Sequence, residues 1–273
     1  MKRLVAATLA AGVCVGSSAG AFAADLRPAP VYLKAPPVLY TWAGFYGGAN
    51  GGWVGSAGNT ITLTGTDTAT AGLGSMLANG VIPGNVDLGY SGFLGGGQVG
   101  YNWQSGSWVL GLEGDLDWVS AKSSAVFPDC VLPPPPQGLA PPLTVNAARE
   151  LDWLGTVRGR IGYTPTAPFL LYATGGLAVG EHKLGIGLVD STAAPPANLF
   201  GQTSSTSVGW TVGAGAEWMF ARQWSVKAEY LYVDLGNISS TISYAYPTGQ
   251  NSTLTATVRD RDNIVRGGVN YHF

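Results

Sequence analysis

Large apolar residues alternate with small or polar residues along much of the chain, and a period of two is typical of β-strands whose two faces meet different surroundings. The alternation is clearest at residues 206–220. One face there carries Val208, Trp210, Val212, Ala214, Ala216, Trp218 and Phe220, and the other carries Gly209, Thr211, Gly213, Gly215, Glu217 and Met219. The same pattern predicts strands at residues 42–54, 93–104, 108–120, 151–163, 169–180, 206–220, 224–235 and 258–273.

The connections between these strands alternate between short and long. Short turns are expected at residues 105–107, 164–167 and 221–223, and long stretches rich in Gly, Ser, Thr and Pro lie at residues 55–92, 121–150, 181–205 and 236–257. In an outer-membrane barrel, the periplasmic turns are short and the extracellular loops are long. The predicted fold is therefore all-β: an eight-stranded antiparallel up-and-down transmembrane β-barrel. A soluble lipocalin-like barrel is the rival, but its exterior would have to be polar.

Aromatic residues gather at both ends of the predicted strands, as the two aromatic girdles of a membrane barrel do. The predicted girdle residues are Trp42, Trp53, Trp103, Trp108, Trp118, Trp153, Tyr163, Trp210, Trp218, Trp224 and Tyr271. Trp108 and Trp118 are ten residues apart, as are Trp153 and Tyr163. Ten residues at ~3.4 Å each, tilted by ~45°, rise about 24 Å. This height matches the apolar band of about 25 Å in such barrels.

Most charged residues of the strands fall on the face opposite the aromatic residues. They are Glu113, Asp115, Asp117, Arg158, Arg160, Glu217, Lys227, Glu229, Asp262 and Arg266. Aligning Trp118 with Trp153 places Glu113 opposite Arg158, and aligning Trp224 with Tyr271 places Glu229 opposite Arg266. Buried charges must be paired to be tolerated, so a salt-bridged plug inside the barrel is expected. A polar pore or proton path is the alternative interpretation of the same charges.

Composition and the N-terminal segment point to export. Only 11% of the 273 residues are charged, against roughly 25% in soluble domains, whereas 46% are hydrophobic. Lys2 and Arg3 precede a short apolar stretch, and Ala21 and Ala23 supply a small-residue cleavage pattern. We therefore expect a signal peptide at residues 1–23, a Pro-rich periplasmic lead-in at 24–41 and the barrel at 42–273. The net charge of −2 argues against a nucleic-acid partner.

Candidate catalytic and cofactor motifs are weak. Residues 95–100 match the glycine pattern of dinucleotide-binding proteins, but the strand-type alternation continues through Tyr101 where that motif needs a helix. His182 and His272 are expected at opposite rims, so no metal site is predicted. Glu150 and Asp152 are carboxylates that could form an acid/base pair, yet no Ser/His/Asp arrangement is evident in the sequence. We expect neither an enzyme nor a cofactor.

The segments "WAGFYGGANGGW", "GGGQVGYNWQ", "GTVRGRIGY", "LLYATGGLAVG" and "RGGVNYHF" resemble the small outer-membrane β-barrel family of alphaproteobacterial surface antigens. The barrel of that family is similar to the OmpA transmembrane domain, and the resemblance covers residues 42–273. It implies that Phe273 is the assembly signal read by the barrel-insertion machinery. Unlike OmpA, this chain has no peptidoglycan-binding domain after the barrel, so envelope tethering by that route is not expected.

The expected location is the cell outer membrane, with the bilayer and its lipopolysaccharide as surroundings. The expected function is a structural role in envelope integrity, with surface-exposed loops. A narrow passive porin-like channel and a loop-mediated adhesin or ligand-binding surface are the alternatives. Contact with peptidoglycan, host cells or phage is left open by the sequence, because the loop composition is generic.

Overall fold

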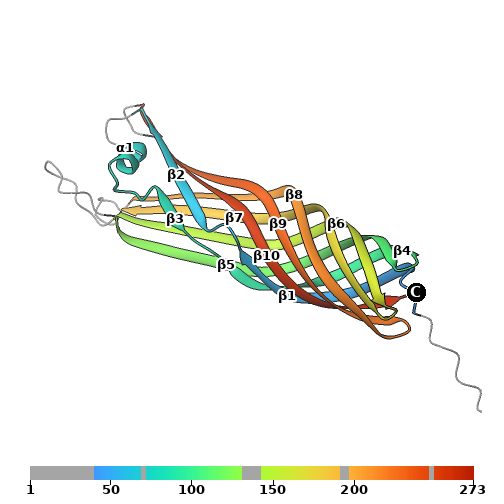
Figure 1. Ribbon diagram of the computed structural model, residues 1–273. Helices are drawn as coiled ribbons and strands as arrows, with labels where there is room; N and C mark the ends of the chain where they lie inside the picture. The colour runs from blue at the N-terminus through green and yellow to red at the C-terminus, as the bar shows by residue number, and fades with distance from the viewer. Residues whose placement is uncertain (1–39, 69–71, 131–142, 191–196, 246–248) are drawn as a thin grey trace, which may run out of the picture. The chain divides into compact units, whose positions relative to one another are not determined.

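A closed ring of eight antiparallel strands forms the body of the protein (Figure 1). The computed structural model describes residues 40–68, 72–130, 143–190, 197–245 and 249–273. The ring strands are β1 (Gly44–Ser56), β4 (Ser91–Ser105), β5 (Trp108–Cys130), β6 (Leu143–Thr166), β7 (Phe169–Asp190), β8 (Ala197–Ala221), β9 (Trp224–Ala245) and β10 (Asn251–His272). Each pairs with the next in this order, and β1 pairs with β10. The predicted up-and-down barrel is confirmed.

Tight turns connect the strands at one end of the barrel. Residues 106–107, 167–168 and 222–223 separate β4 from β5, β6 from β7, and β8 from β9. Gly106 adopts a φ of +60°, a conformation that favours glycine in a two-residue hairpin turn. These turns match the three expected from the sequence and define the periplasmic end.

The other end differs from the prediction of long loops, because most of those residues continue the strands. Residues 121–130, 143–150, 181–190, 197–205, 236–245 and 251–257 extend β5 to β10. The stretch 55–92 contains β2 (Thr60–Asp67), α1 (Leu73–Ala78) and β3 (Asn85–Asp87). β2 pairs with β10, and β3 pairs with β2. Glycine, serine and threonine suggested loops, but ladder hydrogen bonds and a buried inner face outweigh the low strand propensity of glycine here.

The extended strands divide into two sheets. Pairing between β4 and β5 stops at Gly92 and Ala121, and pairing between β8 and β9 stops at Trp210 and Asp234. Beyond these points β5, β6, β7 and β8 form one sheet, whereas β9, β10, β2 and β3 form the other. We call this part the sandwich; it comprises the described residues of 57–90, 122–150, 182–209 and 235–260.

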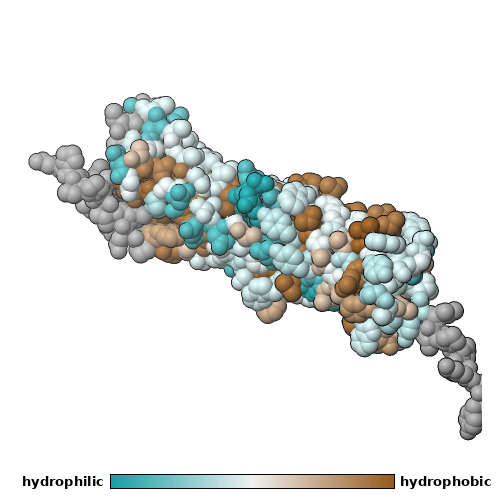
Figure 2. Space-filling view, in the orientation of Figure 1, coloured by the Kyte–Doolittle hydropathy of each residue, from teal (hydrophilic) through white to brown (hydrophobic). Residues whose placement is uncertain are grey.

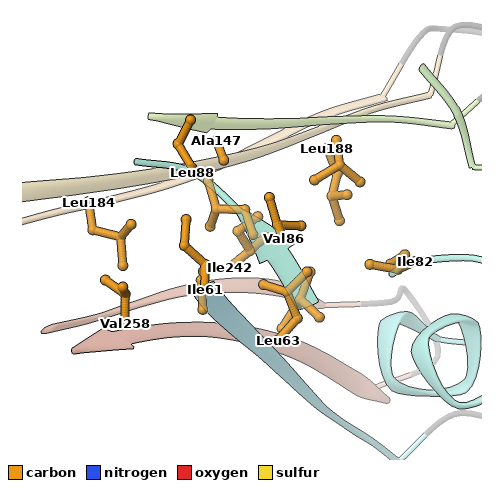
Figure 3. Close-up of a cluster of buried hydrophobic side chains, with 14 of the residues drawn as sticks. Ile61, Leu63, Ile82, Val86, Leu88, Ala147, Leu184, Leu188, Ile242 and Val258 are labelled. Carbon is orange, nitrogen blue, oxygen red and sulfur yellow. The ribbon is translucent and has the colours of Figure 1, made fainter. Parts of the chain in front are cut away.

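An apolar core fills the space between the two sheets of the sandwich (Figure 3). Ala147, Leu184 and Leu188 project from one sheet toward Ile242 and Val258 of the other. β2 and β3 add Ile61, Leu63 and Val86 to this core. The sandwich therefore has the interior of a soluble domain.

Polarity inverts along β7 between the barrel and the sandwich. In the barrel part of β7 the outward side chain of Leu177 is 61% exposed, while the inward positions 174, 176, 178 and 180 are small or polar. In the sandwich part of β7 the inward residues Leu184 and Ile186 are buried and apolar. The outward apolar surface ends where the inward apolar core begins, as expected if lipid surrounds the first part and water the second. No helix in the part of the chain that the structure describes is long and apolar enough to cross a membrane.

Candidate functional site

The barrel lumen holds a charged cluster built from inward positions of five strands, β5, β6, β8, β9 and β10. We call it the lumen network; it consists of Glu113, Asp115, Asp117, Arg158, Arg160, Glu217, Lys227, Glu229 and Arg266, all buried. Its members are five carboxylates and four cations, and His272 Nε2 lies 3.6 Å from the carboxylate of Glu217. The near balance of charge fits the requirement that buried ions be paired.

Arg158 on β6 is one hub of the lumen network. Its guanidinium lies 2.5 Å from Glu113, 2.8 Å from Asp115 and 2.9 Å from Glu229. Glu113 faces Arg158 in the strand register, as predicted from the pairing of Trp118 with Trp153. Lys227 Nζ also donates to Glu113 at 2.9 Å. The pair expected from the sequence is thus part of a larger shared network.

Arg266 makes a second such hub on β10. It contacts Glu229 at 2.9 Å, Asp115 at 3.1 Å and Asp117 at 2.6 Å. The register places it opposite Glu229, again as the sequence predicted. Because Asp115 and Glu229 contact both arginines, the network joins strands on opposite walls of the barrel.

An apolar layer closes the lumen on the periplasmic side of the lumen network. It consists of Trp42, Val109, Leu170, Tyr172 and Met219. Trp42 is fully buried, and its indole Nε1 donates to the Ala167 carbonyl oxygen at 3.1 Å. The prediction that Trp42 belongs to a lipid-facing girdle is therefore wrong. Trp42 precedes β1, so the alternation of that strand does not set the direction of its side chain.

A second apolar layer lies on the other side of the lumen network. Its buried members are Val54, Tyr90, Leu94, Ala121, Leu151, Leu154, Ala178, Leu231, Val233, Leu235 and Ile264. The order of inward residues along β10 makes the layering explicit: Arg266 belongs to the network, Ile264 to the apolar layer, and Asp262 and Asp260 follow. Asp262, which the sequence grouped with the lumen network, thus lies beyond the apolar layer, because alternation sets only its face and not its height.

Asp260 organises another buried polar group at the base of the sandwich. The Asp260 cluster consists of Tyr90, Arg149, His182, Ser207 and Asp260. The Asp260 carboxylate lies 2.6 Å from His182 Nδ1 and accepts hydrogen bonds from Arg149 at 2.8 Å and from Tyr90 at 2.9 Å. Burial by itself would raise the pKa of Asp260, but the His182 hydrogen bond and the Arg149 charge outweigh it and lower that pKa.

His182 Nε2 also lies 2.9 Å from Ser207 Oγ, so Ser207, His182 and Asp260 are linked in the order of a catalytic triad. No motif in the sequence indicated this arrangement, because the three residues lie on three different strands. Arg149 additionally donates to the carbonyl oxygens of Gly58, which precedes β2, and Leu88, which follows β3, and so ties both segments to β6. The cluster has the contacts of a structural tie between the two sheets.

The other candidate residues from the sequence are dispersed. Residues 95–100 lie within β4 and not at the start of a helix. Glu150 and Asp152 are ion-paired with Lys122 and Lys183. His182 lies in the Asp260 cluster and His272 near Glu217 at the periplasmic end. Within the described ranges, no three metal-ligating side chains come together.

The predicted girdle residues other than Trp42 lie on the outer surface of the barrel, where lipid would contact them. Trp103, Trp108, Tyr163, Trp218 and Trp224 are 45–57% exposed near the tight turns. Trp53, Trp118 and Trp210 are 45–68% exposed at the opposite level, and Trp153 is half-buried there beside Trp118. Phe273 is 80% exposed, and its backbone N–H donates to Phe45. Ala21 and Ala23, the predicted cleavage residues, lie outside the described residues.

The outward face of the sandwich carries a groove of about 750 Å³ across β5, β6, β7 and β8. Gly185 and Gly187 form its floor, and the exposed side chains of Val126 and Phe200 flank it. A Cβ at Gly187 would come within 2.7 Å of the Phe200 ring, so a side chain there would require this exposed ring to shift. Lys122, Glu150 and Lys183 line the end of the groove nearest the barrel.

Comparison with known proteins agrees with this architecture. A family model described as "Outer membrane protein beta-barrel domain" matches residues 7–273. The 31 kDa outer-membrane immunogenic protein of Brucella melitensis is 33% identical over 274 residues, which cover 100% of both chains. The 22 kDa outer membrane protein of Rhizobium leguminosarum is 36% identical over 141 residues, which cover 51% of this chain and 52% of that protein.

Similar solved structures are distant. The outer membrane protein OprG of Pseudomonas aeruginosa is 15% identical with a TM-score of 0.41, covering 87% of this chain and 100% of OprG. The Escherichia coli outer membrane protease OmpT is 9% identical with a TM-score of 0.39, covering 83% of this chain and 97% of OmpT. TM-scores of this size are too low for a residue-by-residue comparison. The match over residues 7–273 and the Brucella relative show that this chain belongs to the outer membrane protein beta-barrel domain family and is an outer-membrane protein.

Proposed function

We propose that this protein is a closed structural barrel of the outer membrane that holds a packed extracellular sandwich, and that it does not conduct solutes. The observation that carries the proposal is the layering of the lumen. Apolar layers lie on both sides of the lumen network, and Trp42, Leu154 and Ile264 are among their fully buried members. A conducting pore needs a continuous polar path, and these layers interrupt it.

The width of the barrel supports the same proposal. Eight strands enclose a lumen that side chains can fill. Here Arg158 and Arg266 link carboxylates from several strands, which holds the walls together from the inside. Such a barrel is suited to a mechanical role in the envelope, because unzipping any strand would expose buried charges.

Conductance in planar lipid bilayers tests the proposal. The mature protein, refolded and inserted, should show no steady single-channel current, whereas a known porin inserted under the same conditions provides the positive control. Insertion is checked by heat-modifiable migration on a detergent gel. A steady, protein-dependent current with reproducible steps would overturn the closed-barrel proposal.

A protein with this role must be exported and inserted into the outer membrane. We propose that residues 1–23 are a signal peptide cleaved after Ala23, that residues 24–41 are a periplasmic lead-in, and that the exposed Phe273 is read by the barrel-insertion machinery. Mass spectrometry of the protein from outer membranes should find an N-terminus at Ala24. Removal of Phe273 should slow insertion while leaving export intact, which pulse-chase fractionation measures.

Surface recognition is the second candidate function, and the groove on the sandwich favours it. Val126 and Phe200 leave apolar side chains exposed beyond the membrane, where water would otherwise surround them. Cells displaying the Val126→Ser/Phe200→Ser variant should then bind host cells or phage less than cells displaying the wild type at equal surface density. Equal binding would remove this candidate.

A further inference from the structure

The outward residues of β10 change in chemical type from the sandwich to the membrane. In order they are Thr253, Thr255, Thr257, Arg259, Arg261, Asn263 and Val265. The sequence of types is three hydroxyls, two cations, one amide and one apolar side chain. The inward residues between them, such as Asp260 and Ile264, are buried, so the strand presents this series to its surroundings.

The last member of this series, Val265, lies in the apolar band of the barrel. Val265 is 62% exposed, and Val208 and Trp210 on β8 are 68% and 45% exposed. Trp210 packs against Tyr232 with ring centroids 5.6 Å apart, which marks the outer aromatic girdle on this side. Acyl chains of the outer leaflet would contact this surface.

The two arginines lie just beyond that girdle. Tyr232 pairs with Asn263, and Arg261 and Arg259 are the next outward residues along β10. Asp234 holds both guanidinium groups, at 2.8 Å from Arg259 and 3.6 Å from Arg261. One buried carboxylate therefore orients two half-exposed cations, which leaves a local charge of +1 at the depth of the lipid head groups.

Above the arginines the outer face is a grid of hydroxyls. The register aligns three rows across β2, β10 and β9: Thr62, Thr257 and Ser239; Thr64, Thr255 and Thr241; Thr66, Thr253 and Ser243. Strand propensity alone accounts for threonine on an exposed sheet. What propensity does not explain is the position of this grid directly above a fixed pair of arginines.

The opposite side of the rim differs in charge. There Lys122 and Lys183 stand beside the carboxylates of Glu150, Asp152 and Glu181. Its local charge is −1, so the two lysines are neutralised. Figure 2 shows a strongly hydrophilic patch over β9 and β10, between hydrophobic surface on either side. The β9 and β10 side is therefore the part of the rim best suited to an anion.

We propose that the outer face of β8, β9, β10 and β2 is a binding site for lipopolysaccharide, the phosphorylated glycolipid of the outer leaflet. Its acyl chains lie on Val208, Trp210 and Val265. Its phosphates contact Arg259 and Arg261, whose planar groups suit phosphate geometry. Its core sugars lie on the hydroxyl grid. The inference rests on the outer-membrane location and not on whether the lumen is closed.

Binding of fluorescently labelled lipopolysaccharide to the protein in phosphatidylcholine nanodiscs tests the site. Two basic residues near an anionic surface contribute roughly 1 kcal/mol each, so Arg259→Gln/Arg261→Gln should raise the Kd roughly thirtyfold. The matched control Lys122→Gln/Lys183→Gln removes the same charge from the other side and should change the Kd less than about twofold, since those lysines are already paired. Equal losses in both variants would overturn the proposal.

Two further measurements do not depend on the folding of the arginine variant. Dephosphorylated lipopolysaccharide should bind the wild type roughly thirtyfold more weakly than intact lipopolysaccharide does. Thr255→Val, at the centre of the grid, should weaken binding of lipopolysaccharide but leave binding of lipid A without core sugars unchanged. Equal competition by phosphatidylglycerol vesicles and lipopolysaccharide would show a general anionic surface and overturn the glycolipid site.

Discussion

Arg158 Nη2 lies 2.5 Å from Glu113 Oε1 across β5 and β6, and the same guanidinium also contacts Asp115 and Glu229. One cation thus contacts three carboxylates inside the barrel. The sequence predicted the first of these contacts as an isolated pair. Because the partners are shared, the energetics of this pair cannot be separated from those of its neighbours.

Removing Arg158 should strongly destabilise the barrel. Arg158→Met leaves buried carboxylates without their counter-ion, and such changes cost about 3–5 kcal/mol. Reversing both charges, as Glu113→Lys/Arg158→Glu, should restore little, because Glu at position 158 would face Asp115 and Glu229. Urea unfolding from lipid vesicles, followed by tryptophan fluorescence, measures both effects.

Lys183→Gln is the matched control for this experiment. Lys183 pairs with Asp152 on the outer surface, so its removal should leave the urea midpoint of unfolding nearly unchanged. Recovery of wild-type stability by the double charge reversal would show that Glu113 and Arg158 form an independent pair.

A charge on the outer face of a strand should be costly in the barrel, as on β7, and harmless in the sandwich, as on β6. Leu177→Lys places a cation against lipid, which costs about 2–4 kcal/mol near the middle of the bilayer. Ala148→Lys makes the same kind of change on the exposed outer face of the sandwich, where water solvates it. Folding yield into vesicles should fall for the first variant only. Equal yields would mean that lipid does not surround Leu177.

Acid should release α1 from the sandwich through Asp67. Its carboxylate accepts hydrogen bonds from the Gly74 backbone N–H at 3.0 Å and from Ser75 Oγ at 2.9 Å. Burial acts to raise the pKa of Asp67, but hydrogen bonds from Ser252, Gly74 and Ser75 outweigh it and lower that pKa to about 2. The stabilisation is therefore complete above the ordinary pKa of about 3.9 and lost as the pH falls through about 2.

Hydrogen exchange at Gly74 and Ser75 measures this effect. Asp67→Asn should lose protection of these amides at neutral pH, as acid does to the wild type. Asp87→Asn is the control, since the Asp87 carboxylate accepts a hydrogen bond from Thr60 of β2, which lies outside α1. Unchanged protection in Asp67→Asn would contradict the role given to this carboxylate.

Ser207 should not react as a catalytic serine, although its contacts with His182 and Asp260 follow the order of a triad. The Asp260 carboxylate also accepts hydrogen bonds from Arg149 and Tyr90, so the contacts of the Asp260 cluster join the two sheets. A fluorophosphonate probe should therefore leave the refolded wild type unlabelled, with a serine hydrolase as positive control. Labelling that disappears in Ser207→Ala would contradict this prediction and reopen the enzyme alternative.

Alternation and aromatic spacing were enough to predict the barrel. The pairing of Trp118 with Trp153 and of Trp224 with Tyr271 set the register correctly, and with it the positions of Glu113 and Glu229. Trp42 was misplaced, because it precedes the first strand and the indole turns into the lumen. The Asp260 cluster was missed, because Tyr90, Arg149 and His182 come from stretches that were expected to be loops.

A signal for the sandwich was present in the sequence. In "HKLGIGLVD" the apolar residues Leu184, Ile186 and Leu188 alternate with period two, but on the opposite phase from Leu177 and Val179. Glycine, serine and threonine between such residues favoured a loop assignment. A change of phase within one strand means that the apolar side has moved from the outside to the inside.

The sequence by itself determined the location, the strand order and the two faces of each strand, because periodicity and composition are local properties of the chain. Only the tertiary structure decided which surroundings each face meets. Where the ring closes, lipid lies outside and ion pairs lie within; where it opens beyond Trp210 and Asp234, water lies outside and an apolar core lies within. Burial depends on neighbours that are distant in sequence, so the same alternation can serve both arrangements.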